Sequence, residues 1–309
     1  MLIKLFRPAL VTLLCAGSLA LPVLVVTSSE TGAGAAIGTT CAGPSIAKPG
    51  GGYWRCTFDD EFSGTALDRT KWMAVTTAHT GTTGGAACFV DSRNNIAVGN
   101  GHLSLTARRE AAPLLCQGPG TNLRTQYTSG QVSTYDRFSQ TYGRFAVRAQ
   151  FPAATVAGLQ SAIWMWPQDP AAHVSWPESG EIDIAEEYSR YADRVIPYIH
   201  YLHRLTYSLF QPGGSTVNNV TNRYCLIKDV HAFHEYALVW TPTRMTITFD
   251  GATCLIDDYR AMSSVPGGPF NQPFYLTLTQ ALGIGRNPFN PATTPMPATT
   301  QVDWVRIWK

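Results

Sequence analysis

The chain has few charged residues. Asp, Glu, Lys and Arg together make up 14% of its 309 residues, and the formal net charge is +2. Proteins that bind nucleic acid or a strongly acidic partner concentrate charge of one sign, so the composition indicates neither kind of partner. Aromatic residues are plentiful instead, at 11%, with 8 Trp and 13 Tyr. This profile is typical of β-rich proteins.

An amphipathic helix of ordinary length is also missing after the first 35 residues. Pro and Gly occur in nearly every segment between the predicted strands. Alternating apolar and polar residues predict strands, as at residues 142–151, where Phe145, Val147 and Ala149 share one face. Other strands are predicted at residues 102–107, 236–240, 245–249, 274–279 and 302–308. Many short strands without helices predict an all-β sandwich of two antiparallel sheets, one of them concave, with a groove for a polymer.

The first 35 residues place Lys4 and Arg7 ahead of an apolar run, which small and polar residues follow. This order is typical of a secretory signal peptide, and the length of the run leaves a retained membrane anchor as the alternative. We therefore expect a secreted, extracellular or cell-envelope protein, with no stable membrane partner once the signal is removed. Residues 36–52 are expected to form a flexible lead-in and residues 53–309 a single domain.

The cysteines lack the close pairs and the accompanying histidines of a zinc site. Cys15 falls in the N-terminal segment, which leaves an even set of six, as expected in an oxidising compartment. Six cysteines can pair in many ways. The pairing that we favour joins neighbours in the sequence: Cys41 with Cys56, Cys88 with Cys116, and Cys225 with Cys254.

Residues 179–186 read SGEIDIAE, which places three acids among apolar residues on a predicted buried strand. Glu181 and Asp183 share a face, and a β-bulge near Ala185 would bring Glu186 to the same side. Carboxylates in a row raise one another's pKa, so one is expected to stay protonated while another is ionised. Cleavage of a glycosidic bond needs such a pair. A solvated edge and a calcium site are the alternatives.

Aromatic residues and a histidine flank these acids. Trp164 and Trp176 precede them, and an indole ring stacks on the apolar face of a sugar, although burial in the core is the alternative for each. The next strand is expected to bring His200 to the groove, in preference to His203 on its opposite face. Sequence reasoning therefore predicts a sugar-binding groove around the acids.

A second cluster indicates a metal site. Glu61, near the predicted first strand, and Asp303, on the last one, would lie together if these strands pair. Their oxygens suit a structural calcium ion, and a surface network of ion pairs is the alternative. No cofactor is expected for the chemistry itself.

In these features the chain resembles glycoside hydrolase family 16, in particular its bacterial β-1,3-glucanase (laminarinase-like) branch. The stretch SGEIDIAE is similar to the family's Glu-x-Asp-x-x-Glu signature in its bulged form. Shorter matches lie at residues 58–62, 67–68, 71–72, 95–105, 142–145, 233–240, 273–276 and 302–306. The likeness covers residues 53–309, which are therefore expected to be the catalytic domain.

The resemblance implies a jelly-roll sandwich and a retaining mechanism in a monomer that acts on a polysaccharide. It implies Glu181 as nucleophile, Glu186 as acid/base, Asp183 as assisting acid, Trp176 as an aromatic residue of the cleft, and Glu61, the Gly101 carbonyl and Asp303 as calcium ligands. With Trp176, we expect Trp164, His200 and Arg148 to bind the substrate.

Two positions depart from the family's pattern: Ala146 replaces an acid and Thr279 an asparagine that many relatives carry. Our main prediction is endo-acting hydrolysis of β-1,3-glucan. The alternatives are a hydrolase or transglycosylase of another polysaccharide, such as a galactan, and a carbohydrate-binding or cell-wall module without turnover. The bulged signature argues against the tighter Glu-x-Asp-x-Glu arrangement of lichenases and xyloglucan enzymes.

Overall fold

The computed structural model describes residues 41–169, 175–202, 215–216, 219–259 and 268–309. The chain divides into two units, Met1–Ile37 and Gly38–Lys309, and all described residues belong to the second. The predicted signal peptide, Cys15 and His203 therefore lie outside the described residues. Within the described ranges no helix has the length and apolar character needed to cross a membrane.

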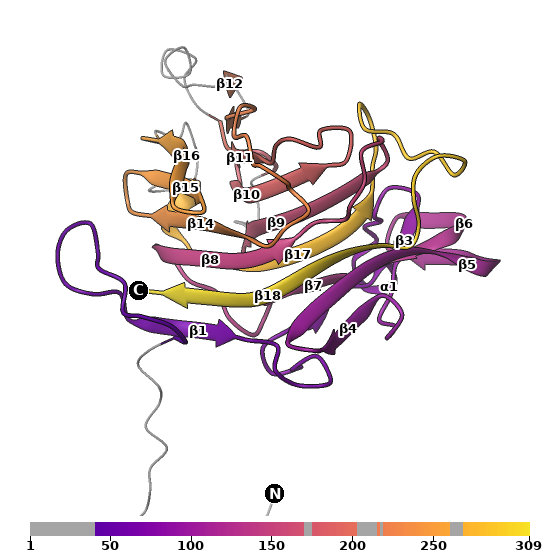
Figure 1. Ribbon diagram of the computed structural model, residues 1–309, viewed down its shortest axis with the longest axis horizontal. Coiled ribbons are helices and arrows are strands. Elements are labelled where there is room, and N and C mark those ends of the chain that lie inside the picture. The colour runs from indigo at the N-terminus through magenta and orange to yellow at the C-terminus, as the bar shows by residue number, and fades with distance from the viewer. Residues whose placement is uncertain (1–40, 170–174, 203–214, 217–218, 260–267) are drawn as a thin grey trace, which may run out of the picture. The chain divides into compact units, whose positions relative to one another are not determined.

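The first sheet contains ten strands and joins both ends of the second unit, because β1 (Cys56–Asp60) pairs with β18 (Ala298–Trp308) (Figure 1). Its order is β16 (Ala252–Asp257), β15 (Met245–Phe249), β14 (His234–Trp240), β8 (Gly143–Gln150), β18, β5 (His102–Gly118), β6 (Thr121–Ser129) and β3 (Ala87–Phe89). β4 (Ile96–Gly99) pairs with β5. The pairing of β3 with β6 is parallel, and the others are antiparallel.

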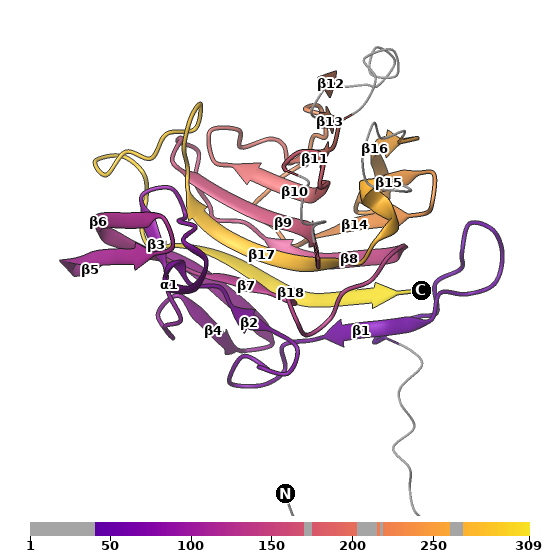
Figure 2. The ribbon, with the colours of Figure 1, turned by 180° about the vertical axis from the view of Figure 1, so that it is seen from behind.

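The second sheet contains eight strands, and Figure 2 shows it from behind. Its order is β12 (Ser215–Thr216), β13 (Asn219–Thr221), β11 (Ile196–His200), β10 (Glu181–Tyr188), β9 (Leu159–Pro167), β17 (Phe274–Leu282), β7 (Gln131–Ser133) and β2 (Met73–Ala74). The helical elements of the described residues are short, namely α1 (Thr77–Thr80) and the 3₁₀ helix η1 (Pro269–Asn271). The acidic strand β10 therefore lies inside this sheet, flanked by β9 and β11.

The core lies between the two sheets and follows the alternation of the sequence. Phe145 and Val147 of β8 in the first sheet belong to the same buried cluster as Ile163 of β9 and Ile182 of β10 in the second. Arg144 and Arg148, on the other face of β8, are only partly buried. This packing confirms the predicted all-β jelly-roll sandwich, because the apolar faces of the two sheets meet in one buried cluster.

The three disulfides are those that sequence proximity predicts: Cys41–Cys56, Cys88–Cys116 and Cys225–Cys254. The first of them corrects the expected domain boundary. Cys41 is only 5% exposed and packs with Trp308 at the end of the last strand, so residues 41–52 are tied to the domain. The small residues of this segment indicated a flexible lead-in, but the covalent bond and the buried sulfur hold it in place.

Candidate active site

The row of acids depends on a bulge in β10. Along the pairing of β10 with β9, Asp183 lies opposite Trp164 and Ala185 opposite Ile163, so β10 advances two residues where β9 advances one. Ile184 and Ala185 are both fully buried. The extra residue confirms the predicted bulge and returns Glu186 to the face of Glu181 and Asp183, where all three acids line one groove.

Glu186 is held by two hydrogen bonds. The Gln160 amide of β9 donates to Oε1 at 2.8 Å, and the Tyr188 hydroxyl donates to Oε2 at 2.6 Å. Sequence reasoning missed both donors. The contact with Tyr188 could have been predicted, because a residue two positions after Glu186 lies on the same face of a strand. The contact with Gln160 could not, because it depends on the register between β9 and β10.

Glu181 and Asp183 form a second set of contacts with Trp176 and His200. The Trp176 indole N–H donates to Glu181 Oε2 at 2.6 Å, and His200 Nε2 lies 3.2 Å from Asp183 Oδ2. His200 lies opposite Glu181 in the register of β11, as expected for the strand after the acids. Candidate ligand atoms of Glu181, Asp183 and His200 lie within 4.8 Å of one another. Trp176 donates to Glu181, and Asp183 pairs with His200, which are contacts that suit groups exchanging protons.

Burial raises the pKa of all three carboxyl groups. The pKa of Glu181 is raised to about 8, chiefly by burial and next by the Asp183 charge, while His200 and the Trp176 hydrogen bond oppose the rise. Burial, followed by the Glu186 charge, raises the pKa of Asp183. For Glu186 burial again raises the pKa, and the hydrogen bonds that it accepts oppose the rise. The predicted direction is confirmed, but burial is a larger cause than mutual repulsion.

Aromatic side chains extend the groove on one side of the acids. Trp164 lines the space around the acids and also an adjoining pocket of about 520 Å³, whose walls include Trp166, Tyr135 and Tyr275. The Trp164 indole N–H donates to the Thr279 hydroxyl at 2.9 Å. Trp176 is 48% exposed, and its ring centre lies 5.3 Å from that of His200. Both predicted tryptophans therefore lie at the groove rather than in the core.

Arg148 is not part of this groove, so its assignment to substrate binding is corrected. It lies on β8 of the first sheet, where it forms an ion pair with Asp303 and covers the Phe233 ring at 4.9 Å. The motif that contains Arg148 does not show which sheet its strand joins. The strand order shows that it joins the first sheet, whereas the acids lie on the second.

The proposed calcium ligands meet arginines instead. The first and last strands pair as predicted, but both carboxylate oxygens of Glu61 accept hydrogen bonds from Arg306, at 2.7 and 2.8 Å, and Asp303 pairs with Arg148. Gly101 lies in the turn between β4 and β5. Since arginines already neutralise both carboxylates, these residues do not fit a calcium site as arranged. The alternative, a network of ion pairs, describes the contacts of this cluster.

Known proteins resemble this chain in sequence and in fold. The model of the family described as "Glycosyl hydrolases family 16" matches residues 85–306. The glucan endo-1,3-beta-glucosidase A1 of Niallia circulans is 31% identical over 82% of this chain, which spans only 37% of that relative's length. The beta-glucanase of Rhodothermus marinus is 30% identical, with 83% of this chain and 86% of the relative covered. The X-ray structure of the laminarinase from Rhodothermus marinus superposes with a TM-score of 0.67 at 28% identity, covering 83% of this chain and 97% of that one. Because the family model matches most of the chain, the protein belongs to glycosyl hydrolase family 16.

Proposed function

We propose that this glycoside hydrolase cleaves β-1,3-linked glucan internally and with retention of configuration. The observation that carries the proposal is the bulge in β10, which aligns Glu181, Asp183 and Glu186 in one groove. The names of the Niallia and Rhodothermus relatives support β-1,3-glucan as the substrate class, and the family retains the anomeric configuration. A groove with aromatic walls on one side of the acids suits a chain that continues past the cleaved bond.

In the first step, the protonated Glu186 donates its proton to the glycosidic oxygen while the ionised Glu181 attacks the anomeric carbon. The bond to the leaving chain breaks and an ester to Glu181 forms. In the second step, Glu186 accepts a proton from water, the water oxygen attacks the same carbon, and the ester breaks. Two inversions leave the configuration unchanged.

Two neighbours of the acids oppose the rise that burial causes in the pKa of Glu181. Glu181 must lose its proton to attack, and the Trp176 hydrogen bond and the nearby His200 both favour its ionised form. Asp183 lies between the two glutamates and bonds His200, so its charge state changes the proton affinity of both. The reactive form of the row carries a proton on Glu186 and none on Glu181.

The test compares the wild-type protein with Glu181→Gln on laminarin, lichenan, agarose, carrageenan and xyloglucan. We expect new reducing ends from laminarin, with an early fall in viscosity that indicates internal cleavage, and no turnover by the variant. Glu110→Gln, on β5 of the other sheet, is the matched control and should stay active. An active Glu181→Gln variant overturns the assigned nucleophile, and cleavage of a galactan but not laminarin overturns the substrate.

We also propose that the protein is exported and acts as a monomer. The three disulfides support export, because such bonds persist in oxidising compartments. N-terminal sequencing of protein from the culture medium should find a start after the apolar run, and light scattering should give the mass of one chain. Activity confined to the membrane fraction would support the anchor instead.

A further inference from the structure

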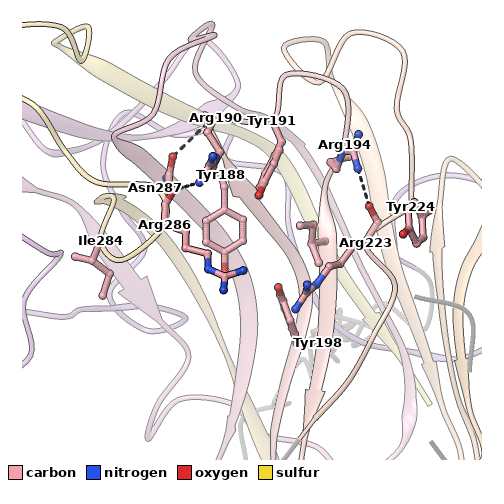
Figure 3. Close-up of a pocket in the computed structure, with 11 residues that line it drawn as sticks. Tyr188, Arg190, Tyr191, Arg194, Tyr198, Arg223, Tyr224, Ile284, Arg286 and Asn287 are labelled. Atoms are coloured by element: carbon pink, nitrogen blue, oxygen red, sulfur yellow. Dashed lines mark hydrogen bonds between the residues drawn. The ribbon is translucent and has the colours of Figure 1, made fainter. Parts of the chain in front are cut away.

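A second pocket beside the acids is lined by cations that the reaction does not use (Figure 3). Its volume is about 340 Å³, within the range of ligand-binding sites. It is lined by four arginines, four tyrosines and three other residues: Arg190, Arg194, Arg223, Arg286, Tyr188, Tyr191, Tyr198, Tyr224, Ile196, Ile284 and Asn287. In a chain with 14% charged residues, this concentration of one sign of charge is unusual.

The pocket adjoins the reaction centre on the Glu186 side. The Tyr188 hydroxyl donates to Glu186, and the rest of its side chain lines the pocket. The Tyr198 ring stacks on His200 with ring centres 5.5 Å apart. Ile284 lines both this pocket and the space around the acids. The arginine-lined space therefore continues the groove on this side of the acids.

Two of the four arginines are already engaged. Arg194 forms an ion pair with Asp193 at 2.7 Å and donates a hydrogen bond to the Arg223 carbonyl at 3.2 Å. Arg190 bonds the Arg286 carbonyl and lies over the Tyr191 ring at 5.2 Å. Both belong to the wall of the pocket, because their contacts hold neighbouring loops together.

Arg223 and Arg286 have no carboxylate partner among the described residues. Both are exposed, and Figure 3 shows their side chains extending toward the same part of the pocket as Tyr188 and Tyr198. They do not pair with Glu186, whose two oxygens are bonded by Gln160 and Tyr188. Clustered guanidinium groups repel one another unless an anion lies between them. The pocket therefore offers two planar, permanently charged donors to a ligand from outside the chain.

We propose that this pocket binds an anionic substituent, a sulfate ester or a carboxylate, on the sugar that lies on the Glu186 side of the cleaved bond. The substrate class is then an anionic polysaccharide. Arg223 already has a hydrogen bond with the neutral Tyr198 side chain, but neither its charge nor that of Arg286 is balanced by a carboxylate among the described residues. A neutral glucan presents only hydroxyl groups to these charges, whereas an oxyanion accepts paired hydrogen bonds from each guanidinium group. The inference rests on the proposed function, because it places the ligand in the same groove.

The experiment measures kcat/KM on three polymers of similar length: laminarin, partially sulfated laminarin and C6-oxidised β-1,3-glucan, whose units carry carboxylates. The wild-type protein should prefer one anionic polymer by roughly tenfold or more, as expected for charge-assisted hydrogen bonds, and the polymer preferred identifies the substituent. Added salt should reduce the preference. The Arg223→Gln/Arg286→Gln variant should lose most of it. Arg124→Gln, an exposed arginine on β6 of the other sheet, should keep it. Equal thermal midpoints exclude misfolding, because both substituted positions are exposed.

The outcomes separate this inference from the proposed function. Hydrolysis of laminarin with no anionic preference, or a preference that the double variant retains, overturns the inference and leaves the proposed function in place. Hydrolysis of an anionic polymer alone, lost with the two arginines, supports the inference and overturns neutral glucan as substrate. If no polymer is hydrolysed, electrophoresis through gels that contain each polymer decides: selective retardation by an anionic polymer, lost in the double variant, supports the inference, and equal mobility overturns it.

Discussion

Glu187 is a fourth carboxyl group that faces away from the other three. It directly follows Glu186 on β10 and is fully buried between the sheets. The Ser161 hydroxyl donates a long hydrogen bond of 3.5 Å to its Oε2. Its Oε1 has no hydrogen-bond partner among the described residues. Burial raises the pKa of Glu187 from an ordinary value of 4.5 to about 8. The folded protein therefore holds this proton at neutral pH, whereas the unfolded chain releases it.

This difference makes stability depend on pH with a defined sign. The folded state binds more protons than the unfolded state between the two pKa values, so the free energy of unfolding falls as the pH rises from about 4.5 toward 8. The slope is about 1.4 kcal/mol per pH unit, which gives a loss of about 2.5 kcal/mol between about pH 5 and pH 7. Glutamine cannot lose a proton, so Glu187→Gln does not show this loss.

Urea unfolding at the two pH values measures the effect. Between about pH 5 and pH 7, the stability of Glu187→Gln relative to the wild-type protein should rise by about 2.5 kcal/mol, because only the wild-type protein loses this free energy. Titration of all other groups is common to both proteins and cancels. Asp68→Asn is the control, because the bonds from Thr70 lower the pKa of this exposed aspartate and it stays ionised throughout. A Glu187→Gln difference that is the same at both pH values refutes the reasoning.

Three further predictions concern the pH profile of kcat/KM for laminarin hydrolysis. Trp176→Phe removes a hydrogen bond that lowers the pKa of Glu181, so the acid limb should move to higher pH by a few tenths to one unit; an unmoved limb means that another group controls it. Tyr188→Phe removes a donor to Glu186, which acts protonated, so the alkaline limb should move to higher pH, and a shift to lower pH contradicts that role. Asp183→Asn removes a charge that raises the pKa of Glu181, so the acid limb should move to lower pH while kcat falls roughly tenfold to hundredfold. A kcat loss as complete as that of Glu181→Gln would assign Asp183 a more direct part.

Local patterns predicted the elements of the fold because each strand carries its own two-residue period. The alternation around Phe145 and Val147 placed their faces correctly, and the expected strands at residues 102–107, 245–249 and 302–308 all form. The first of these continues much further, to Gly118. Its outer half, beyond Ala107, includes Pro113 and exposed residues, so its pattern no longer alternates and its extent depends on pairing with β6.

Contacts between strands far apart in sequence were predicted less well. Glu61 directly follows β1, which pairs with the strand of Asp303. Nothing in the sequence near either acid indicated that Arg306 and Arg148 would neutralise them. The same limit hid Gln160, which reaches Glu186 across the register of two strands. The arginine-lined pocket is the extreme case, because its walls come from three separate segments, residues 188–198, 223–224 and 284–287, and only the assembled sheet brings them together.

The bulge decides which of two adjacent glutamates does chemistry. In a regular strand, Glu181 and Asp183 would share their face with Glu187, and Glu186 would point into the core. One extra buried residue at Ala185 reverses that outcome, so that Glu186 receives two hydrogen bonds in the groove while Glu187 is buried with one weak contact. The cost of that burial appears as the raised pKa of Glu187. The stability loss predicted for Glu187 at neutral pH is therefore a consequence of the same backbone irregularity that assembles the active site.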